Sequence, residues 1–541
     1  MRYYILRAMQ HCQQHVHKVI NKSEVVKRFA GTLLSNDSES RTLTLRTLAT
    51  MSGILLEAFD VHQGIFDALD APLVHEVHAA LVASQLLCAQ SRPFAELVEP
   101  RLSVLISDLA RPTHLKIAAL SVFQHMHHSA KMASHARHVC LAFMKNYPSE
   151  RCAVAALDAT SRLASEYAPH AAPQATLLLA TLASDPRRSV RLGCLRNLAV
   201  LLKGHAAVPL QLSPVLDAAG QTADTLLQAR AIALLLRISK LPLAGRALAD
   251  GVDVLYVLRA AAQQSGSPAA PMLARLLFNI ANTSTLHDTP GAVAAILSHL
   301  LKDADVSVMR SVAAFVRRHP QFCAAFCSKA VSLLSSHRRP ADILCLLRSL
   351  ALVAPEAALG PLSPLLEADA TSLQPLLPGT VAAALPLVSV MEPSAASAFL
   401  NRVAVALQTS ASPSSQYDTA VRAMRNGAFE LSSALLSPLE ARLAHHESYA
   451  WWLRACALLS SGEQLARRGE MGAAGEAFAD ALARLLAAEP ARFFQASYVT
   501  LRLEITDAAR AELDVLRMCA ARPGSILLRR RVRFLFGQYV M

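Results

Sequence analysis

The sequence predicts an all-α protein in which helical hairpins stack into an α-solenoid. Three observations support this prediction: Ala and Leu supply most of the apolar side chains, turn residues recur at a nearly constant spacing, and strand patterns are nearly absent. Hydrophobic residues make up 53% of the 541 residues but aromatic residues only 5%, a balance that favours helix packing over sheets. A chain of this length is long enough for several domains or for one extended repeat array.

One stretch, from Leu177 to Gly204, indicates the repeating unit, which is two helices joined by a tight turn. Asp185 is placed to cap the second helix and Pro186 to occupy its first turn. This helix is expected to bury five apolar side chains at three- and four-residue spacing and to leave its arginines largely outside. The apolar positions are Val190, Cys194, Leu195, Leu198 and Leu202, and the arginines are Arg187, Arg188, Arg191 and Arg196. A hairpin of this length cannot bury its own apolar faces, so it needs neighbours.

Turn signals repeat along the first part of the chain with a mean spacing of about 38 residues, a period typical of HEAT and armadillo repeats. They lie at Asp37, Asp70, Pro112, Pro148, Asp185, Asp224, Pro268 and Asp303. We therefore predict a HEAT/armadillo-like repeat array over residues 1–338.

The remainder of the chain is expected to differ from this array. Residues 339–415 are rich in Ala and Pro and are predicted to form degenerate repeats that end in a polar linker, QTSASPSSQ. Residues 416–521 are predicted to form a tetratricopeptide-like helical block, because Gly427 and Gly469 mark hairpin turns followed by small residues. Residues 522–541 form a basic tail that is expected to be loosely ordered, with RNA or membrane-surface binding as the alternative.

Several classes of function lack their sequence signals. Glycine accounts for only 19 residues, and neither GxGxxG nor GxxxxGK[ST] occurs, so no phosphate-cradling loop is indicated. No apolar run is long enough to span a bilayer, and the start lacks the features of a secretory signal; we expect a soluble chain whose N-terminal part is missing or differently built. The ten cysteines lack paired spacing and are expected to be reduced core residues of an intracellular protein.

Histidines gather around residues 114–138, and on a helix His125 and His128 would share one face. A zinc site needs three or four ligands with supporting carboxylates, and the segment Ser129–Cys140 supplies no acidic residue. These histidines are expected to pack at helix ends, to cap carbonyls or to form a partner surface. His75, Glu76 and His78 read H-E-x-H. This is one residue short of the H-E-x-x-H spacing that places two imidazoles one helical turn apart. We therefore predict no metal, no cofactor and no enzymatic activity.

The chain carries a formal net charge of +13, from 53 Lys and Arg against 40 Asp and Glu. Such a charge attracts acidic partners, including nucleic acid, although an arginine excess also follows from G+C-rich coding. A nucleic-acid-binding or transport adaptor protein built from HEAT repeats is therefore the alternative function.

Three stretches between about His17 and Gly204 carry a resemblance to a known family. They are EVVKRFAGTLLSNDSESRTLTLRTLATMSGIL, FQHMHHSAKMASHAR and LASDPRRSVRLGCLRNLAVLL. In order and wording they resemble the Integrator complex subunit 7 family, most specifically at residues 124–128 and 185–187. The resemblance is strong over the first part of the chain and patchy afterwards. Relative to the family, this chain begins after the N-terminal region, has an Ala/Pro-rich middle of its own and stops before the C-terminal part.

This resemblance implies a nuclear, non-catalytic scaffold subunit that supports the 3′-end processing of small nuclear RNAs and the termination or attenuation of RNA polymerase II transcription. It implies other Integrator subunits as direct partners and RNA polymerase II and protein phosphatase 2A as indirect ones, without a membrane. Cleavage would belong to an endonuclease in other subunits. From the residues themselves we expect partner contacts at exposed arginines beside the turns and at the histidine cluster. The candidates are Arg187, Arg188, Arg191, Arg317, Arg318, His125, His127 and His128.

Overall fold

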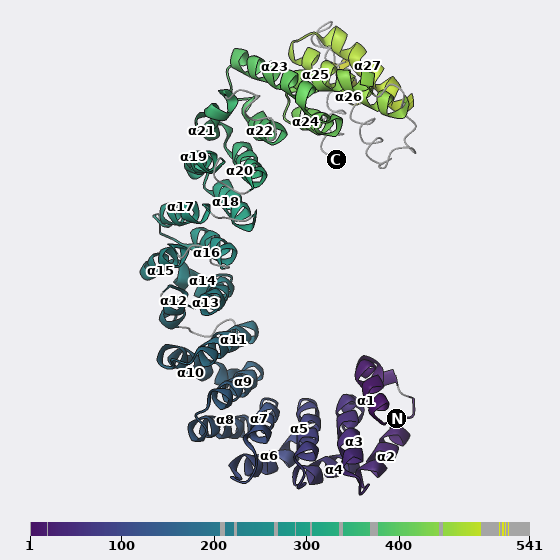
Figure 1. Ribbon diagram of the computed structural model, residues 1–541, viewed down its shortest axis with the longest axis vertical. Coiled ribbons are helices and arrows are strands. Elements are labelled where there is room, and N and C mark those ends of the chain that lie inside the picture. Colours follow the sequence, from purple (N-terminus) through teal and green to yellow (C-terminus); the bar gives the residue numbers. More distant parts are fainter. Residues whose placement is uncertain are drawn as a thin grey trace. The chain divides into compact units, whose positions relative to one another are not determined.

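The computed structural model describes most of the chain, and every regular element in the described part is a helix (Figure 1). The described residues are 2–18, 20–205, 211–220, 224–263, 269–286, 288–302, 306–334, 339–367, 377–442, 447–487, 508, 511–512, 514–515 and 518. The chain divides into two compact units, Met1–Ile296 and Leu297–Met541. The predicted all-α class is confirmed.

The first unit consists mainly of helical hairpins, in each of which a first helix packs against a second. The first helices are α2 (Lys22–Leu33), α4 (Phe59–Leu69), α6 (Arg92–Ser107), α8 (Ala130–Asn146), α10 (Ala171–Ser184), α12 (Ser213–Gly220) and α15 (Val252–Gln263). The second helices are α3 (Ser38–Thr50), α5 (Val74–Cys88), α7 (Thr113–Phe123), α9 (Glu150–Glu166), α11 (Arg188–Gly204), α13 (Thr225–Ile238) and α16 (Ala270–Thr283). Helices α1 (Arg2–His11) and α14 (Pro242–Ala249) pack on α3 and α16. Helix α17 (Thr289–Leu300) contains the boundary between the units.

The second helices of successive hairpins form one continuous row, which we call the B row. Within it α3 packs on α5, α5 on α7, α7 on α9, α9 on α11, α11 on α13 and α13 on α16. Each hairpin therefore buries its apolar side chains against the next one, as expected for a solenoid.

Polar side chains mark several helix starts. The carboxylate of Asp37 accepts a hydrogen bond from the backbone N–H of Glu39 at the start of α3, and Asp224 does the same for Leu226 and Leu227 at the start of α13. A cap of this kind is worth about 1 kcal/mol. The turns predicted at Asp37 and Asp224 are confirmed.

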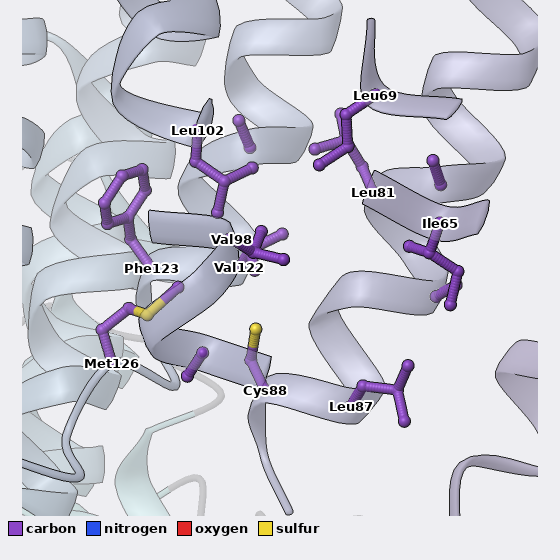
Figure 2. Close-up of a cluster of buried hydrophobic side chains, with 14 of the residues drawn as sticks. Ile65, Leu69, Leu81, Leu87, Cys88, Val98, Leu102, Val122, Phe123 and Met126 are labelled. Carbon is purple, nitrogen blue, oxygen red and sulfur yellow. The ribbon is translucent and has the colours of Figure 1, made fainter. Parts of the chain in front are cut away.

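A continuous apolar core runs through the first hairpins, from Val16 to Leu163. Figure 2 shows the part to which α4, α5, α6 and α7 contribute. Its labelled side chains are Ile65, Leu69, Leu81, Leu87, Cys88, Val98, Leu102, Val122, Phe123 and Met126. Burying one large aliphatic side chain stabilises a fold by about 2 kcal/mol, so this core holds the first hairpins together.

The second unit continues with hairpins and ends in longer helices. Its helices are α18 (Val306–Arg318), α19 (Cys323–Leu333), α20 (Pro340–Val353), α21 (Pro355–Glu367), α22 (Leu377–Ala384), α23 (Pro393–Ser410), α24 (Pro413–Arg425), α25 (Phe429–Arg442), α26 (Glu447–Arg467) and α27 (Met471–Ala487). Short 3₁₀ helices in the two units are η1 (Gln13–Lys18), η2 (Ser52–Ile54), η3 (Ala168–His170), η4 (Pro320–Phe322) and η6 (Leu385–Leu387). No helix in the described ranges has both the length and the apolar character that crossing a bilayer requires.

The last four helices, α24 to α27, each pack on the next one along the chain, and we call them the C-terminal hairpins. Gly427 and Gly469 stand in two of their turns with φ of +75° and +82°. After each glycine a backbone N–H reaches back five residues, from Ala428 to the carbonyl of Ala423 and from Glu470 to that of Leu465. This hydrogen bond is typical of a helix end that needs glycine. The predicted glycine turns are confirmed.

Two local expectations differ from the structure. Asp185 ends α10 instead of capping α11, which begins at Arg188, so Pro186 lies before the helix. The reason is that the Asp185 carboxylate accepts hydrogen bonds from Arg187, from both its backbone N–H and its guanidinium. The residues expected as a polar linker lie instead at the end of α23 and the start of α24, where Ser412 caps the helix.

Some expectations fall outside the described residues. These are the turns at Pro268 and Asp303 and the basic tail 522–541.

Candidate functional site

Polar contacts join neighbouring hairpins of the first unit at a spacing of one repeat. They connect residues between 35 and 41 positions apart, and we call them one-period contacts. They include Arg41 with Glu76, Arg111 with Ala71, Ser121 with Gln85, Arg162 with Gln124, Arg188 with Asp224, Arg196 with Asp158, Arg237 with Ala199 and His205 with Ala164. Because hydrogen bonds are directional, these contacts fix the position of each hairpin against the next. Apolar packing alone would let neighbouring hairpins slide past each other.

Arg187 lies inside this network. Its guanidinium contacts the Asp185 carboxylate at 2.6 Å and donates to the backbone carbonyl of Pro148 at 2.5 Å. The paired charges lower the pKa of Asp185 and raise that of Arg187, chiefly through the hydrogen bonds between the two side chains. Arg187 therefore joins the start of α11 to the turn before α9, one repeat earlier.

Arg188 makes a corresponding contact in the other direction along the array. Its guanidinium forms an ion pair with Asp224, the residue that caps α13. The hydrogen bonds from Arg188 lower the pKa of that carboxyl group. Both arginines thus have internal partners, and their predicted role in partner contact stays a prediction.

The other three candidate arginines differ in exposure. Arg191 is half-buried on α11, and its Nε atom lies out of solvent without a hydrogen-bond partner among the described residues. Arg317 and Arg318 are exposed in the last turn of α18, where positive charge complements the helix dipole. Their partner role is likewise a prediction.

The candidate histidines lie in the connection between α7 and α8 and not on a helix, contrary to the premise that His125 and His128 share a helical face. His128 Nε2 lies 2.6 Å from the carbonyl oxygen of Cys88, the last residue of α5. This imidazole therefore donates to an end-of-helix carbonyl, which is one of the roles predicted for the cluster.

His125 and His127 are held as neutral rings. The side-chain amide of Gln124 donates to His125 at 2.8 Å and accepts from Arg162 at 3.0 Å. Burial, with His127, Arg162 and His128 nearby, lowers the pKa of His125 to about 4. Burial also lowers the pKa of His127, whose ring lies 4.6 Å from that of His128. Within the described residues no group of three or more His, Cys, Asp or Glu side chains is placed to hold a metal ion.

Two buried cysteine thiols, those of Cys140 and Cys194, show the same neutral character. Burial raises the pKa of Cys140 and of Cys194 to about 12. At neutral pH these two thiols are protonated, and thiols in this state are poor nucleophiles.

A groove with a volume of about 690 Å³ crosses the B row over α9, α11 and α13. Its buried and half-buried lining is apolar, and its exposed lining is largely cationic. The apolar side chains include Val154, Leu192, Leu195, Val200 and Leu234, and the cationic ones are Arg196, Lys203, Arg230 and Arg237. The groove can accept a ligand with both apolar and acidic groups, and we call it the B-row groove.

None of the four cations of the B-row groove is among the candidates predicted above. The pattern of α11 predicts that Arg196 is exposed, but it assigns no role to Arg196, Lys203, Arg230 or Arg237. The available signal was the regular alternation of apolar and basic residues along two successive amphipathic helices, which predicts one mixed stripe on each helix.

The sequence of this chain matches a known protein family. The family model for the N-terminal part of Integrator complex subunit 7 matches residues 1–428, which include the whole B-row groove. Integrator complex subunit 7 of Gallus gallus is 34% identical over 201 residues, which cover 37% of this chain and 21% of the relative. The Homo sapiens protein gives the same identity and coverage. The chain thus spans about a fifth of the length of these curated relatives.

A structural comparison supports the architecture. One chain of a homology model of the full-length AP-3 complex in an intermediate open conformation matches with a TM-score of 0.50 and 12% identity, over 93% of this chain and 100% of that chain. At this identity the likeness shows the fold alone. Because the family model covers well over half of the sequence, this chain belongs to the family defined by the N-terminal part of Integrator complex subunit 7.

Proposed function

We propose that the protein is a non-catalytic scaffold subunit of the Integrator complex. The observation that carries this proposal is the family match over residues 1–428, joined to a fold in which each hairpin contacts mainly its neighbours. Such an array leaves long helical faces for partners. In this role the protein works in the nucleus and holds other Integrator subunits in a fixed arrangement.

The described side chains support a structural role. The groups with shifted pKa values include histidines kept neutral by burial and carboxylates paired with arginines, and the pair of Arg188 with Asp224 joins one hairpin to the next. A catalytic site would bring a nucleophile or a general base together with groups that stabilise a transition state. We infer that cleavage is carried out by other subunits.

Membership of the Integrator complex suggests a more specific role for the protein. We propose that the subunit supports the 3′-end processing of small nuclear RNAs and the termination or attenuation of RNA polymerase II transcription. RNA polymerase II and protein phosphatase 2A are its indirect partners in this proposal. We also propose that the chain divides into four parts. They are a repeat array (1–338), degenerate repeats (339–415), a helical block (416–521) and a basic tail (522–541).

Depletion of the protein followed by complementation tests this function. We expect small nuclear RNA precursors with extended 3′ ends to accumulate, and the other Integrator subunits to separate into smaller assemblies in a glycerol gradient. Restoring the wild-type chain should reverse both effects. Normal 3′ ends together with an intact assembly in the depleted cells would contradict the proposal.

The alternative of direct nucleic-acid binding is favoured by the net charge of +13. Binding of RNA by the purified chain should then weaken steeply as salt rises, because phosphate contacts release counterions. A flat salt dependence, or no binding at moderate salt, removes this alternative.

A further inference from the structure

Two stripes of side chains form the B-row groove. On α11 and on α13, apolar and cationic residues alternate every three or four positions, so both kinds lie on one helix face. The α11 stripe is Leu192, Arg196, Val200 and Lys203, and the α13 stripe is Leu226, Arg230, Ala233 and Arg237. The two stripes are neighbours because α11 packs directly on α13.

Among the described residues, the positive charge of the groove is only partly compensated. Arg196 is neutralised by Asp158, whose carboxylate it contacts at 2.6 Å. Arg237 donates to the backbone carbonyl of Ala199 at 3.2 Å, which leaves its charge in place. No ion pair is recorded within the described residues for Lys203 or Arg230. The lining thus carries three positive charges without an acidic partner in the part of the chain that the structure describes, and none of its members is acidic.

The apolar side chains between these cations are accessible. Leu226 is 43% exposed, and Leu192 and Val200 are half-buried at the surface of the groove. From Leu192 to Lys203 the α11 stripe extends about 16 Å, the length of about three helical turns. Apolar surface framed by charge of one sign is typical of a site that binds an amphipathic helix of the opposite charge.

We propose that the B-row groove binds an acidic amphipathic helix of a partner protein. About three turns of that helix would place apolar side chains at positions i, i+3 or i+4, and i+7 against Leu192, Val200 and Leu226, and Asp or Glu on its flanks against Lys203, Arg230 and Arg237. This inference rests on the proposed scaffold function, because it names the chemistry of one partner of the scaffold.

The lining favours a peptide over RNA. Single-stranded RNA is bound by aromatic side chains on which bases stack, and none of the described lining residues is aromatic. The apolar floor would contribute nothing to phosphate binding, whereas it would bury the apolar face of a helix.

A binding experiment with the full chain tests the inference. The probe is a fluorescein-labelled 16-residue helix with Leu on one face and Glu elsewhere, and binding is followed by fluorescence anisotropy. A peptide of the same composition, with Leu scattered around the helix, is the control ligand. We expect the amphipathic peptide to bind at least about tenfold more tightly than the scattered one, because only the first buries a continuous apolar stripe.

Two variants of the chain separate charge from shape. Lys203→Glu/Arg230→Glu should weaken peptide binding by about tenfold or more, because both reversed charges then repel the acidic flanks. Lys131→Glu/Lys145→Glu on α8 changes the net charge equally at two exposed positions outside the groove, and should alter affinity less than twofold. Ala233→Arg adds positive charge but obstructs the apolar floor, so it should weaken peptide binding as well.

Three results would overturn the inference. They are equal affinity for the two peptides, equal loss in the groove and α8 variants, or tighter binding by Ala233→Arg. The last result, with stronger binding of a 16-nucleotide oligouridylate, would identify a nucleic-acid surface instead. Circular dichroism confirms that each variant is folded. If the groove variants lose peptide binding as expected and still restore small nuclear RNA processing in depleted cells, scaffolding does not use this groove. If instead the wild-type chain binds the peptide and depletion leaves processing unchanged, only the proposed function fails.

Discussion

The array of the first unit and the C-terminal hairpins hold their helices together by different means. In the array, one-period contacts such as Arg41 with Glu76 join equivalent helices of successive repeats. In the C-terminal hairpins, glycines with positive φ fix the turns, and the helices meet through small polar contacts such as Ser460 with Ser432 at 3.0 Å. Side-chain contacts at a similar spacing also occur in the C-terminal hairpins, for example between Trp452 and the Tyr417 hydroxyl at 3.0 Å. The two regions therefore differ in their glycine turns and in how deeply their ion pairs are buried.

The largest expected difference in stability between the two regions comes from removing one ion pair in each. Glu76 is 4% exposed and holds Arg41 at 2.6 Å, whereas Glu430 is 37% exposed and pairs with Arg468 at the surface. Glu76→Ala should lower the free energy of unfolding by about 3 kcal/mol, because it removes the buried carboxylate from a half-buried guanidinium that then keeps its hydrogen bond to the Ser35 carbonyl. Glu430→Ala should cost less than about 0.5 kcal/mol. Urea denaturation followed by circular dichroism measures both, and similar shifts in the two variants would show that burial does not distinguish the regions.

Glycine substitutions test the backbone side of the comparison. Gly427→Ala and Gly469→Ala should each destabilise the protein by about 1 kcal/mol, because an L-residue is strained at positive φ. The loss should be larger at Gly427, where a Cβ atom would also lie 2.7 Å from Arg467 Nη2. Gly193→Ala, within α11, is the matched control in the array.

At Gly193 the new Cβ would meet Val154 at 3.7 Å, an ordinary contact. The substitution should therefore stabilise α11 by up to about 1 kcal/mol through helix propensity. Thermal melts of the three variants give the comparison, and a loss of stability at Gly193 equal to that at Gly469 would contradict it.

Acidification should change the stability of the two regions in opposite directions. The pKa of His125 is lowered to about 4 by burial, so between pH 6.5 and pH 4 the unfolded state binds more protons than the folded state, and stability falls as the pH falls. Between pH 7 and pH 5.5 this histidine should cost about 0.5–1 kcal/mol, after allowance for its partial solvent exposure. The pKa of Glu463 on α26 is raised by burial, which gives the opposite sign, since the folded state then favours the protonated carboxyl group.

Hydrogen exchange read by mass spectrometry at pH 7 and pH 5.5, corrected for intrinsic exchange rates, resolves the two regions. Protection should fall for peptides from α7 to α9 and not for those from α25 to α27. His125→Gln should reduce the pH dependence of the first set. A uniform loss of protection in both regions would argue against this assignment.

The smallest effect concerns the candidate arginines. Arg187→Glu should lower the stability by about 0.5 kcal/mol, because it replaces the contact with Asp185 by repulsion at a partly exposed site. Arg317→Glu, in the last turn of α18, should stay within about 0.5 kcal/mol of the wild type. Affinity purification of Integrator subunits with each folded variant tests the partner role. Unchanged recovery with Arg317→Glu would remove that residue from the candidates.

Much of the fold was predictable from local pattern. The capping carboxylates at Asp37 and Asp224, the turns at Gly427 and Gly469 and the buried positions Val190 and Leu198 each follow from neighbours within four or five residues. The role of Arg188 was not predictable in this way, because its partner Asp224 lies 36 residues away. Only the stacking of hairpins brings the two side chains together.

The candidate site was predicted less well for the same physical reason. Asp158 and Arg196 lie one repeat apart, so a search for opposite charges at the repeat period would have found the pair. The B-row groove depends in addition on which faces of α9, α11 and α13 remain uncovered, and that is decided by packing between helices. The histidine cluster was predicted by composition, but the loop conformation that sends His128 to the end of α5 was not.

The one-period contacts also have a mechanical consequence. Each of them bridges only adjacent repeats, so a bending or stretching force on the first unit would be shared among many weak joints in series, none of which spans a longer stretch of chain. Compliance of this kind adds up along the array: small rotations at each joint sum to a large displacement of its ends at little elastic energy. In the scaffold role proposed above, such an array follows the motions of its partners while each hairpin stays folded.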